Sequence, residues 1–98
     1  MENIIKFDLN KMGSSDIASM HKVINAYREV PHSEHDIFET GFNLNTGYVY
    51  IALENNIQIC SCFGQDVEYL VYDYDTGEEY WYDTYDEAME HDNAFIYN

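Results

Sequence analysis

Basic residues are scarce in this chain. Its 98 residues include 4 Lys and Arg against 19 Asp and Glu, which gives a net charge of -15. Because Lys and Arg supply most of the affinity for phosphates, nucleic acid is a poor direct ligand. Proline occurs once and glycine five times, which excludes a collagen-like or proline-rich chain. No apolar run reaches the length of a membrane-spanning helix, so no membrane association is expected.

Cysteine is also rare, with Cys60 and Cys62 as its two occurrences. Two cysteines are too few for a disulfide framework, and a zinc site needs further ligands nearby. The N-terminal residues show no basic segment followed by a long apolar stretch, so no signal peptide is expected. These features predict a cytoplasmic protein with free thiols, no metal and no cofactor.

Motifs for catalysis are missing or incomplete. Neither Gly-rich phosphate loop, GxGxxG or GxxxxGK, occurs in the sequence. Asp75-Thr76-Gly77 matches the tripeptide of aspartic proteases, but it lies between two predicted strands, where a hairpin turn favours Gly. A calcium loop starting at Asp73 would need Gly and Glu where Glu78 and Thr84 stand. We therefore expect a binding protein and not an enzyme.

Apolar residues are plentiful enough for a folded core despite the charge. Hydrophobic residues make up 46% of the chain and aromatic residues 16%. Such a composition predicts a folded chain, in contrast to most strongly acidic sequences. The length predicts a single domain over residues 1–98.

Helical spacing occurs in two places. Ile17, Met20, Ile24 and Tyr27 predict an amphipathic helix over residues 15–29, with Ser14 or Ser15 as its N-cap and Pro31 at its end. The sequence Thr84-Tyr85-Asp86-Glu87 fits a capping box and predicts a short second helix. In this second helix, Tyr85, Ala88 and Met89 would face the sheet.

Alternation of apolar and polar residues predicts the strands. A short first strand is expected over Ile5–Leu9, before the long helix. The later strands are Asp36–Leu44, Tyr48–Leu53, Ile57–Phe63, Val67–Tyr74 and Glu78–Tyr82. Their short connections favour antiparallel pairing, so we predict an α+β fold with an antiparallel β-meander of five to six strands. The pattern does not decide whether Val67, Tyr69 and Val71 or the alternate residues of that strand face the core.

Charge divides sharply along the chain. All four basic residues lie in residues 1–28 with three of the acids, whereas residues 29–98 hold the other 16 acids and no Lys or Arg. Solubility explains negative charge in general but does not require this division. The acids are densest between Asp66 and Asp92, where tyrosines and a tryptophan lie among them. Both solubility and partner binding remain open as explanations.

This acidic, aromatic segment is the candidate partner-binding surface. Carboxylates on strands about 4.8 Å apart, repeating about every 6.6 Å along each strand, approach the spacing of DNA phosphates. Tyr and Trp are favoured at interface hot spots, and aromatic faces accept Arg side chains. The candidate residues are Asp66, Glu68, Tyr69, Tyr72, Asp73, Tyr74, Asp75, Glu78, Glu79, Asp83, Asp86, Glu87 and Glu90.

In size, composition and the segment Asp66–Asp92, the chain resembles the DNA-mimic inhibitors of bacteriophages and mobile elements. That resemblance implies a protein that evades host defence by blocking the nucleic-acid groove of a bacterial CRISPR nuclease, as anti-CRISPR proteins do, or of a restriction enzyme. The partner would then be a basic groove on a protein, not nucleic acid itself. The alternatives are an adaptor for another basic protein surface and a dimeric inhibitor joined through a sheet edge, so both monomer and dimer stay open.

Overall fold

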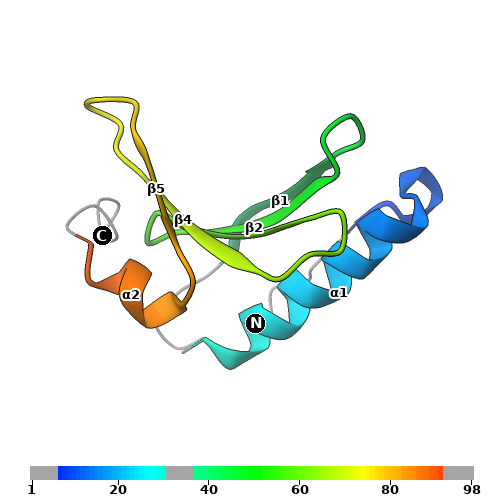
Figure 1. Ribbon diagram of the computed structural model, residues 1–98, viewed down its shortest axis with the longest axis horizontal. Helices are drawn as coiled ribbons and strands as arrows, with labels where there is room; N and C mark the ends of the chain where they lie inside the picture. The colour runs from blue at the N-terminus through cyan, green and yellow to red at the C-terminus, as the bar shows by residue number, and fades with distance from the viewer. Residues whose placement is uncertain (1–6, 31–36, 92–98) are drawn as a thin grey trace.

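Within the part of the chain that the structure describes, the protein forms a five-stranded antiparallel sheet with the two α-helices on one face. The computed structural model describes residues 7–30 and 37–91 (Figure 1). Its elements are η1 (Leu9–Lys11), α1 (Ser14–Glu29), β1 (Ile37–Asn43), β2 (Tyr48–Leu53), β3 (Ile57–Cys62), β4 (Glu68–Tyr72), β5 (Glu79–Tyr82) and α2 (Tyr85–Met89). The strands lie side by side in sequence order, and each neighbouring pair is antiparallel. The predicted α+β meander is confirmed.

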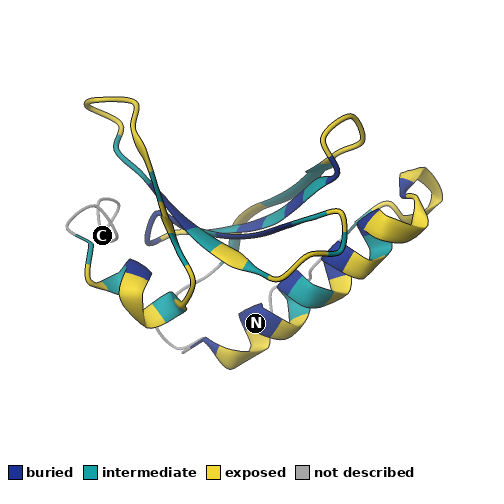
Figure 2. Cartoon of the chain, viewed as in Figure 1, coloured by how far each residue is buried: buried dark blue, intermediate teal, exposed yellow. Residues whose placement is uncertain are grey.

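The core lies between the sheet and the two helices. α1 packs against β2 and β3, whereas α2 packs against β4 and β5 on the same face (Figures 1 and 2). Val49, Ile51 and Ile59 on the sheet are fully buried together with Val23 of α1. Burying an aliphatic side chain of this size contributes about 1.5–3 kcal/mol, so this layer supplies much of the driving force for folding.

The long helix forms where the spacing predicts, but its N-cap differs. Gly13 is the N-cap, and its N–H donates to Oδ2 of Asp16 at 3.1 Å. The prediction of Ser14 or Ser15 as the N-cap was wrong. The bond at this helix start comes from the Asp16 carboxylate, at the third helical position, and not from the side chain of the N-cap residue. The helix ends at Glu29, one residue before its C-cap Val30. Pro31 lies outside the described residues.

The predicted strand at Ile5–Leu9 is not confirmed. Ile5 lies outside the described residues, Phe7 and Asp8 have no regular structure, and Leu9 begins the short helix η1. Oδ1 of Asp8 accepts from the N–H of Asn10 at 3.2 Å. Asp side chains often form hydrogen bonds with nearby backbone N–H groups and so favour local turns. Here the turn forms in place of the strand that the three alternating apolar residues predict.

The two outer hairpins are closed by the same five-residue turn. In the first, Oδ1 of Asn43 accepts from the N–H of Asn45 at 2.8 Å, and Gly47 has φ +67°. In the second, Oδ1 of Asp73 accepts from the N–H of Asp75 at 2.9 Å, and Gly77 has φ +78°. Asp75-Thr76-Gly77 is therefore turn structure, with Gly required by its left-handed backbone.

The short C-terminal helix confirms its predicted cap and orientation. The N–H of Glu87 donates to Oγ1 of Thr84 at 3.1 Å. Ala88 is fully buried, and Tyr85 and Met89 are half-buried against the sheet. Asp86 and Glu87 of this helix and its C-cap Glu90 are exposed.

The face of β4 that the pattern left open is now decided. Val71 is fully buried in a cluster with Ile57 and Ala88 of α2, and it pairs with Ile57 and Tyr80. Tyr69 packs against this cluster and also against the α1 cluster, as Val67 does. The alternate residues of the strand therefore project from the opposite face of the sheet. In the described part of the chain, no helix covers that opposite face (Figure 1).

Candidate functional site

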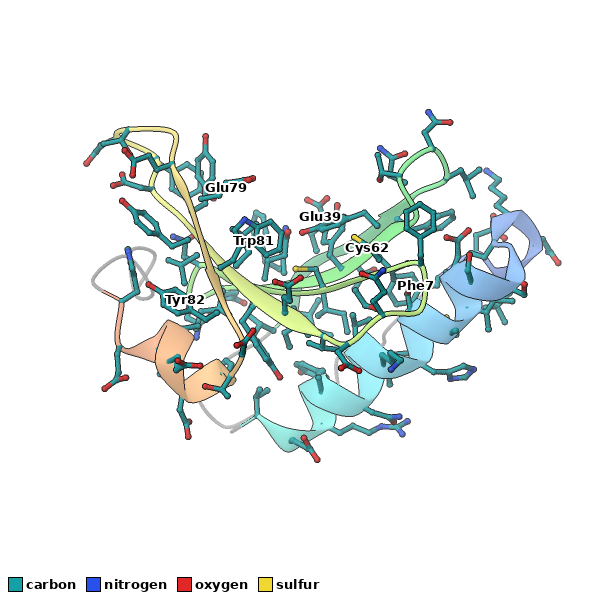
Figure 3. The ribbon with its side chains drawn as sticks, viewed as in Figure 1. Phe7, Glu39, Cys62, Glu79, Trp81 and Tyr82 are labelled. Carbon is teal, nitrogen blue, oxygen red and sulfur yellow. The ribbon has the colours of Figure 1, made fainter. Side chains whose placement is uncertain are left out.

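The uncovered face of the sheet is curved and rich in aromatic side chains. Strand register places Tyr50, Cys60 and Glu68 in one row across it, and Leu70 beside Trp81 in the next. Figure 3 shows Glu39, Trp81 and Glu79 on this side, away from the helices. Trp81 is 43% exposed and Phe38 is 72% exposed. Large exposed aromatic groups on one uncovered face are typical of an interaction surface.

The curvature gathers all five strands around one hollow of about 310 Å³, which we call the central hollow. Glu39 of β1 and Glu79 of β5 both line it, although they are forty positions apart in sequence and at opposite edges of the sheet. Tyr50, Leu70 and Tyr72 contribute to its lining. The hollow therefore combines an aromatic and aliphatic lining with two carboxylates.

Tyr50 fixes one of these carboxylates. Its hydroxyl donates to Oε2 of Glu39 at 2.5 Å, and its ring covers Gly41 on the neighbouring strand. A Cβ atom at Gly41 would lie 2.6 Å from the Tyr50 hydroxyl oxygen, so only glycine leaves room for the ring in this position. Burial, together with the bond to Glu39, raises the pKa of Tyr50 to about 12. The phenol therefore remains a neutral donor at physiological pH.

A second, shallower hollow lies on the same face, lined by Tyr48, Cys62, Glu68 and Trp81 among others. The hydroxyl of Tyr48 donates to Oε1 of Gln58, and the Tyr48 and Tyr50 rings are 5.7 Å apart. Burial raises the pKa of the Cys60 thiol to about 12, and burial also raises the pKa of Cys62. Because the thiolate is the reactive form, neither cysteine is set up as a nucleophile.

The predicted acids at the tip of the β4–β5 hairpin split into structural and exposed groups. Asp73 holds the turn through its side chain, whereas Asp75 and Glu78 are exposed. Oε2 of Glu78 accepts from the Tyr80 hydroxyl at 2.7 Å. Tyr74 is 55% exposed, and its ring lies 4.7 Å from that of Tyr72 in an edge-to-face arrangement.

The acids do not form one flat lattice. Those of α2 lie on the side of the sheet that the helices cover, and the hairpin tip extends on the other side (Figure 1). Both groups flank β5, an edge strand, and exposed Asp83 follows that strand. The acids of the hairpin tip and of α2, together with Asp83, are thus brought to one edge of the molecule and distributed around it.

Three predicted site residues lie elsewhere. Asp66 is in the β3–β4 loop, where its Oδ1 is 3.3 Å from Nζ of Lys22 on α1. Glu68 is exposed at the start of β4 and lines the second hollow. Tyr69 is half-buried in the core, with its ring 6.0 Å from that of Tyr85. Tyr69 therefore stabilises the fold and is not displayed as an anchor.

Sequence reasoning missed the residues of the open face outside the acidic segment. Phe38, Glu39, Tyr48 and Tyr50 were not among the predicted site residues, although all line one of the two hollows. The signal was present in β2, where tyrosines alternate with buried Val49 and with other aliphatic residues. Without the positions of the helices, nothing indicated that the tyrosine side of this strand is uncovered.

Within residues 7–30 and 37–91, no three His, Cys, Asp or Glu side chains are grouped to hold a metal ion. None of the helices described there is long and apolar enough to cross a membrane. Comparisons with protein-family models, curated proteins and solved structures find no match to the chain. The candidate function therefore depends on the chemistry of the surface.

Proposed function

We propose that this protein is an inhibitor that occupies the basic nucleic-acid groove of a bacterial defence nuclease, with a CRISPR effector as the leading target. It would act in the cytoplasm of the bacterial host and need no catalytic residue. The supporting observation is the charge distribution: all five strands and α2 lie in a segment without Lys or Arg, and exposed carboxylates surround β5.

The physical basis is charge complementarity. A groove that binds nucleic acid presents Arg and Lys side chains, which form charge-assisted hydrogen bonds with carboxylates. Asp75 and Glu78 at the hairpin tip, with Asp86 and Glu90 on α2, present such groups to solvent on either side of the edge strand. Attraction between the two surfaces would speed association and weaken as salt rises.

The test is inhibition of purified nucleases. We would mix the protein with a panel of CRISPR effectors and restriction enzymes and measure DNA cleavage and DNA binding. The variant Glu78→Lys/Glu90→Lys reverses two exposed acids whose side chains form neither the Asp73 bond of the hairpin turn nor the Thr84 bond of the α2 N-cap. The matched control Glu29→Lys/Glu54→Lys makes the same change in net charge at two exposed acids, one at the end of α1 and one in the β2–β3 turn.

We expect inhibition by the wild type and the control, and loss of inhibition by at least about tenfold in the first variant. DNA should compete with the inhibitor for the nuclease. Inhibition that is equally strong in both variants would contradict the proposal. Tight binding to a basic protein that DNA does not displace would replace it with an adaptor role.

A further inference from the structure

We infer that the central hollow on the open face of the sheet is a receptor for an arginine side chain of a basic partner protein. The hollow adjoins the hairpin tip, since Tyr74 and Glu79 line it, but its lining does not include Asp75, Glu78 or the acids of α2. The inference rests on the proposed function in one respect, namely that the partner is basic. The inference adds two points to that proposal: the partner residue that is recognised is an arginine, and it binds in the central hollow.

The lining of the hollow matches a guanidinium group. Glu39 and Glu79 supply negative charge, and Tyr50 and Tyr72 supply aromatic surface. A guanidinium is planar, stacks on aromatic rings and donates to a carboxylate through two parallel N–H groups. The volume of about 310 Å³ is at the lower end of the range typical of small-ligand sites, which suits one long side chain.

The side chains that line the hollow are already held in position without a partner. The bond from the Tyr50 hydroxyl orients the Glu39 carboxylate, and the approach of Tyr50 to Gly41 fixes the ring. A side chain held in place by its neighbours loses less conformational entropy on binding. Phe38, which is 72% exposed beside Glu39, offers further aromatic surface at the rim.

Charge decides among possible occupants. Every strand lies in the part of the chain without Lys or Arg, so the face repels phosphates and anionic lipids. A second copy of this face would bring the same carboxylates together, which disfavours a dimer through it. Lysine has the charge but lacks the planar group, so aromatic stacking and bidentate pairing favour arginine.

The probes are three capped peptides, Gly-Gly-X-Gly-Gly, with arginine, lysine or citrulline at X. Citrulline keeps the planar shape but carries no charge. Binding is followed by backbone amide NMR shifts and by the fluorescence of Trp81, the one tryptophan of the chain. Trp81 reports locally because it pairs in register with Leu70, which lines the hollow.

We expect the arginine peptide to shift amides around the hollow and to bind about fivefold or more tightly than the lysine peptide, with no detectable binding of citrulline. Glu79→Gln should weaken arginine binding about tenfold. Its matched control, Glu29→Gln, makes the same charge change at an exposed acid at the end of α1 and should leave binding unchanged.

Gly41→Ala provides a second variant that alters no charge. It displaces the Tyr50 ring and should weaken arginine binding while lysine binding changes less. Because Glu79 is exposed, Glu79→Gln keeps the test valid if Gly41→Ala does not fold. Equal binding of arginine and lysine, or equal loss in Glu79→Gln and Glu29→Gln, would overturn the inference. Nuclease inhibition that depends on Glu78 and Glu90 would still stand in that case.

Discussion

Replacing Asn55 by Ala should detach the acidic helix α2 from the sheet. Asn55 lies in the turn between β2 and β3 and is 1% exposed. Its Nδ2 donates to the hydroxyl of Tyr85 at 2.9 Å, and its Oδ1 accepts from the N–H of Ile57 at 3.2 Å. This one side chain therefore connects the sheet turn to the first residue of α2.

The magnitude follows from these two contacts. Each neutral hydrogen bond contributes about 0.5–1.5 kcal/mol, and a buried donor left without its partner costs about 1–3 kcal/mol. We expect Asn55→Ala to lower the free energy of unfolding by about 2–4 kcal/mol, taking the Ile57 N–H as the donor that loses its acceptor. A domain of this length has about 5–15 kcal/mol in total, so the loss would be large.

Urea unfolding followed by Trp81 fluorescence and far-ultraviolet circular dichroism measures the change. Asn55→Asp, which keeps an acceptor for the Ile57 N–H, should lose less. Hydrogen exchange at Ala88, whose N–H donates to the carbonyl of Thr84, should accelerate more than exchange in the middle of the sheet. A loss below about 0.5 kcal/mol, within the range of ordinary surface substitutions, would refute the reasoning.

Two further predictions concern a turn and a buried thiol. Gly47→Ala should lower the free energy of unfolding by about 1–3 kcal/mol in urea titrations, because φ is +67° and a Cβ atom would lie 2.4 Å from the Phe63 ring. The matched Gly77→Ala, at φ +78° and with a Cβ atom 3.8 Å from the Tyr72 hydroxyl oxygen, should cost less, and an equal cost would contradict the role of Phe63. The pKa of Cys60 rises from 9.0 to about 12 on folding, so the folded state holds the proton and stability falls as pH rises through this window. Unfolding at pH 8 and pH 10 should show a larger loss for the wild type than for Cys60→Ala, and parallel losses would contradict burial of the thiol as the cause.

Sequence determined the elements because local chemistry specifies them. The capping box at Thr84 marks the start of α2 through a hydrogen bond between residues three positions apart. Gly47 and Gly77 mark the hairpin turns because they adopt positive φ angles, which glycine allows. The strand predicted at Ile5–Leu9 did not form at its described residues because a strand requires hydrogen bonds to a neighbouring strand. The turn at Asp8 requires only the local bond from the N–H of Asn10 to the Asp8 carboxylate. The division of charge was also readable without a structure, since it is a property of composition.

Only the tertiary structure decided which surfaces are exposed. Alternation in β4 allows either face to be buried, and the packing of α1 and α2 selects the face with Val71. The same packing leaves Tyr50 and Trp81 uncovered and places Tyr69 in the core. The curvature of the sheet then brings Glu39 and Glu79 to one hollow from its two edges. Such proximity arises from the summed twist and packing of five strands, which no local stretch of sequence encodes.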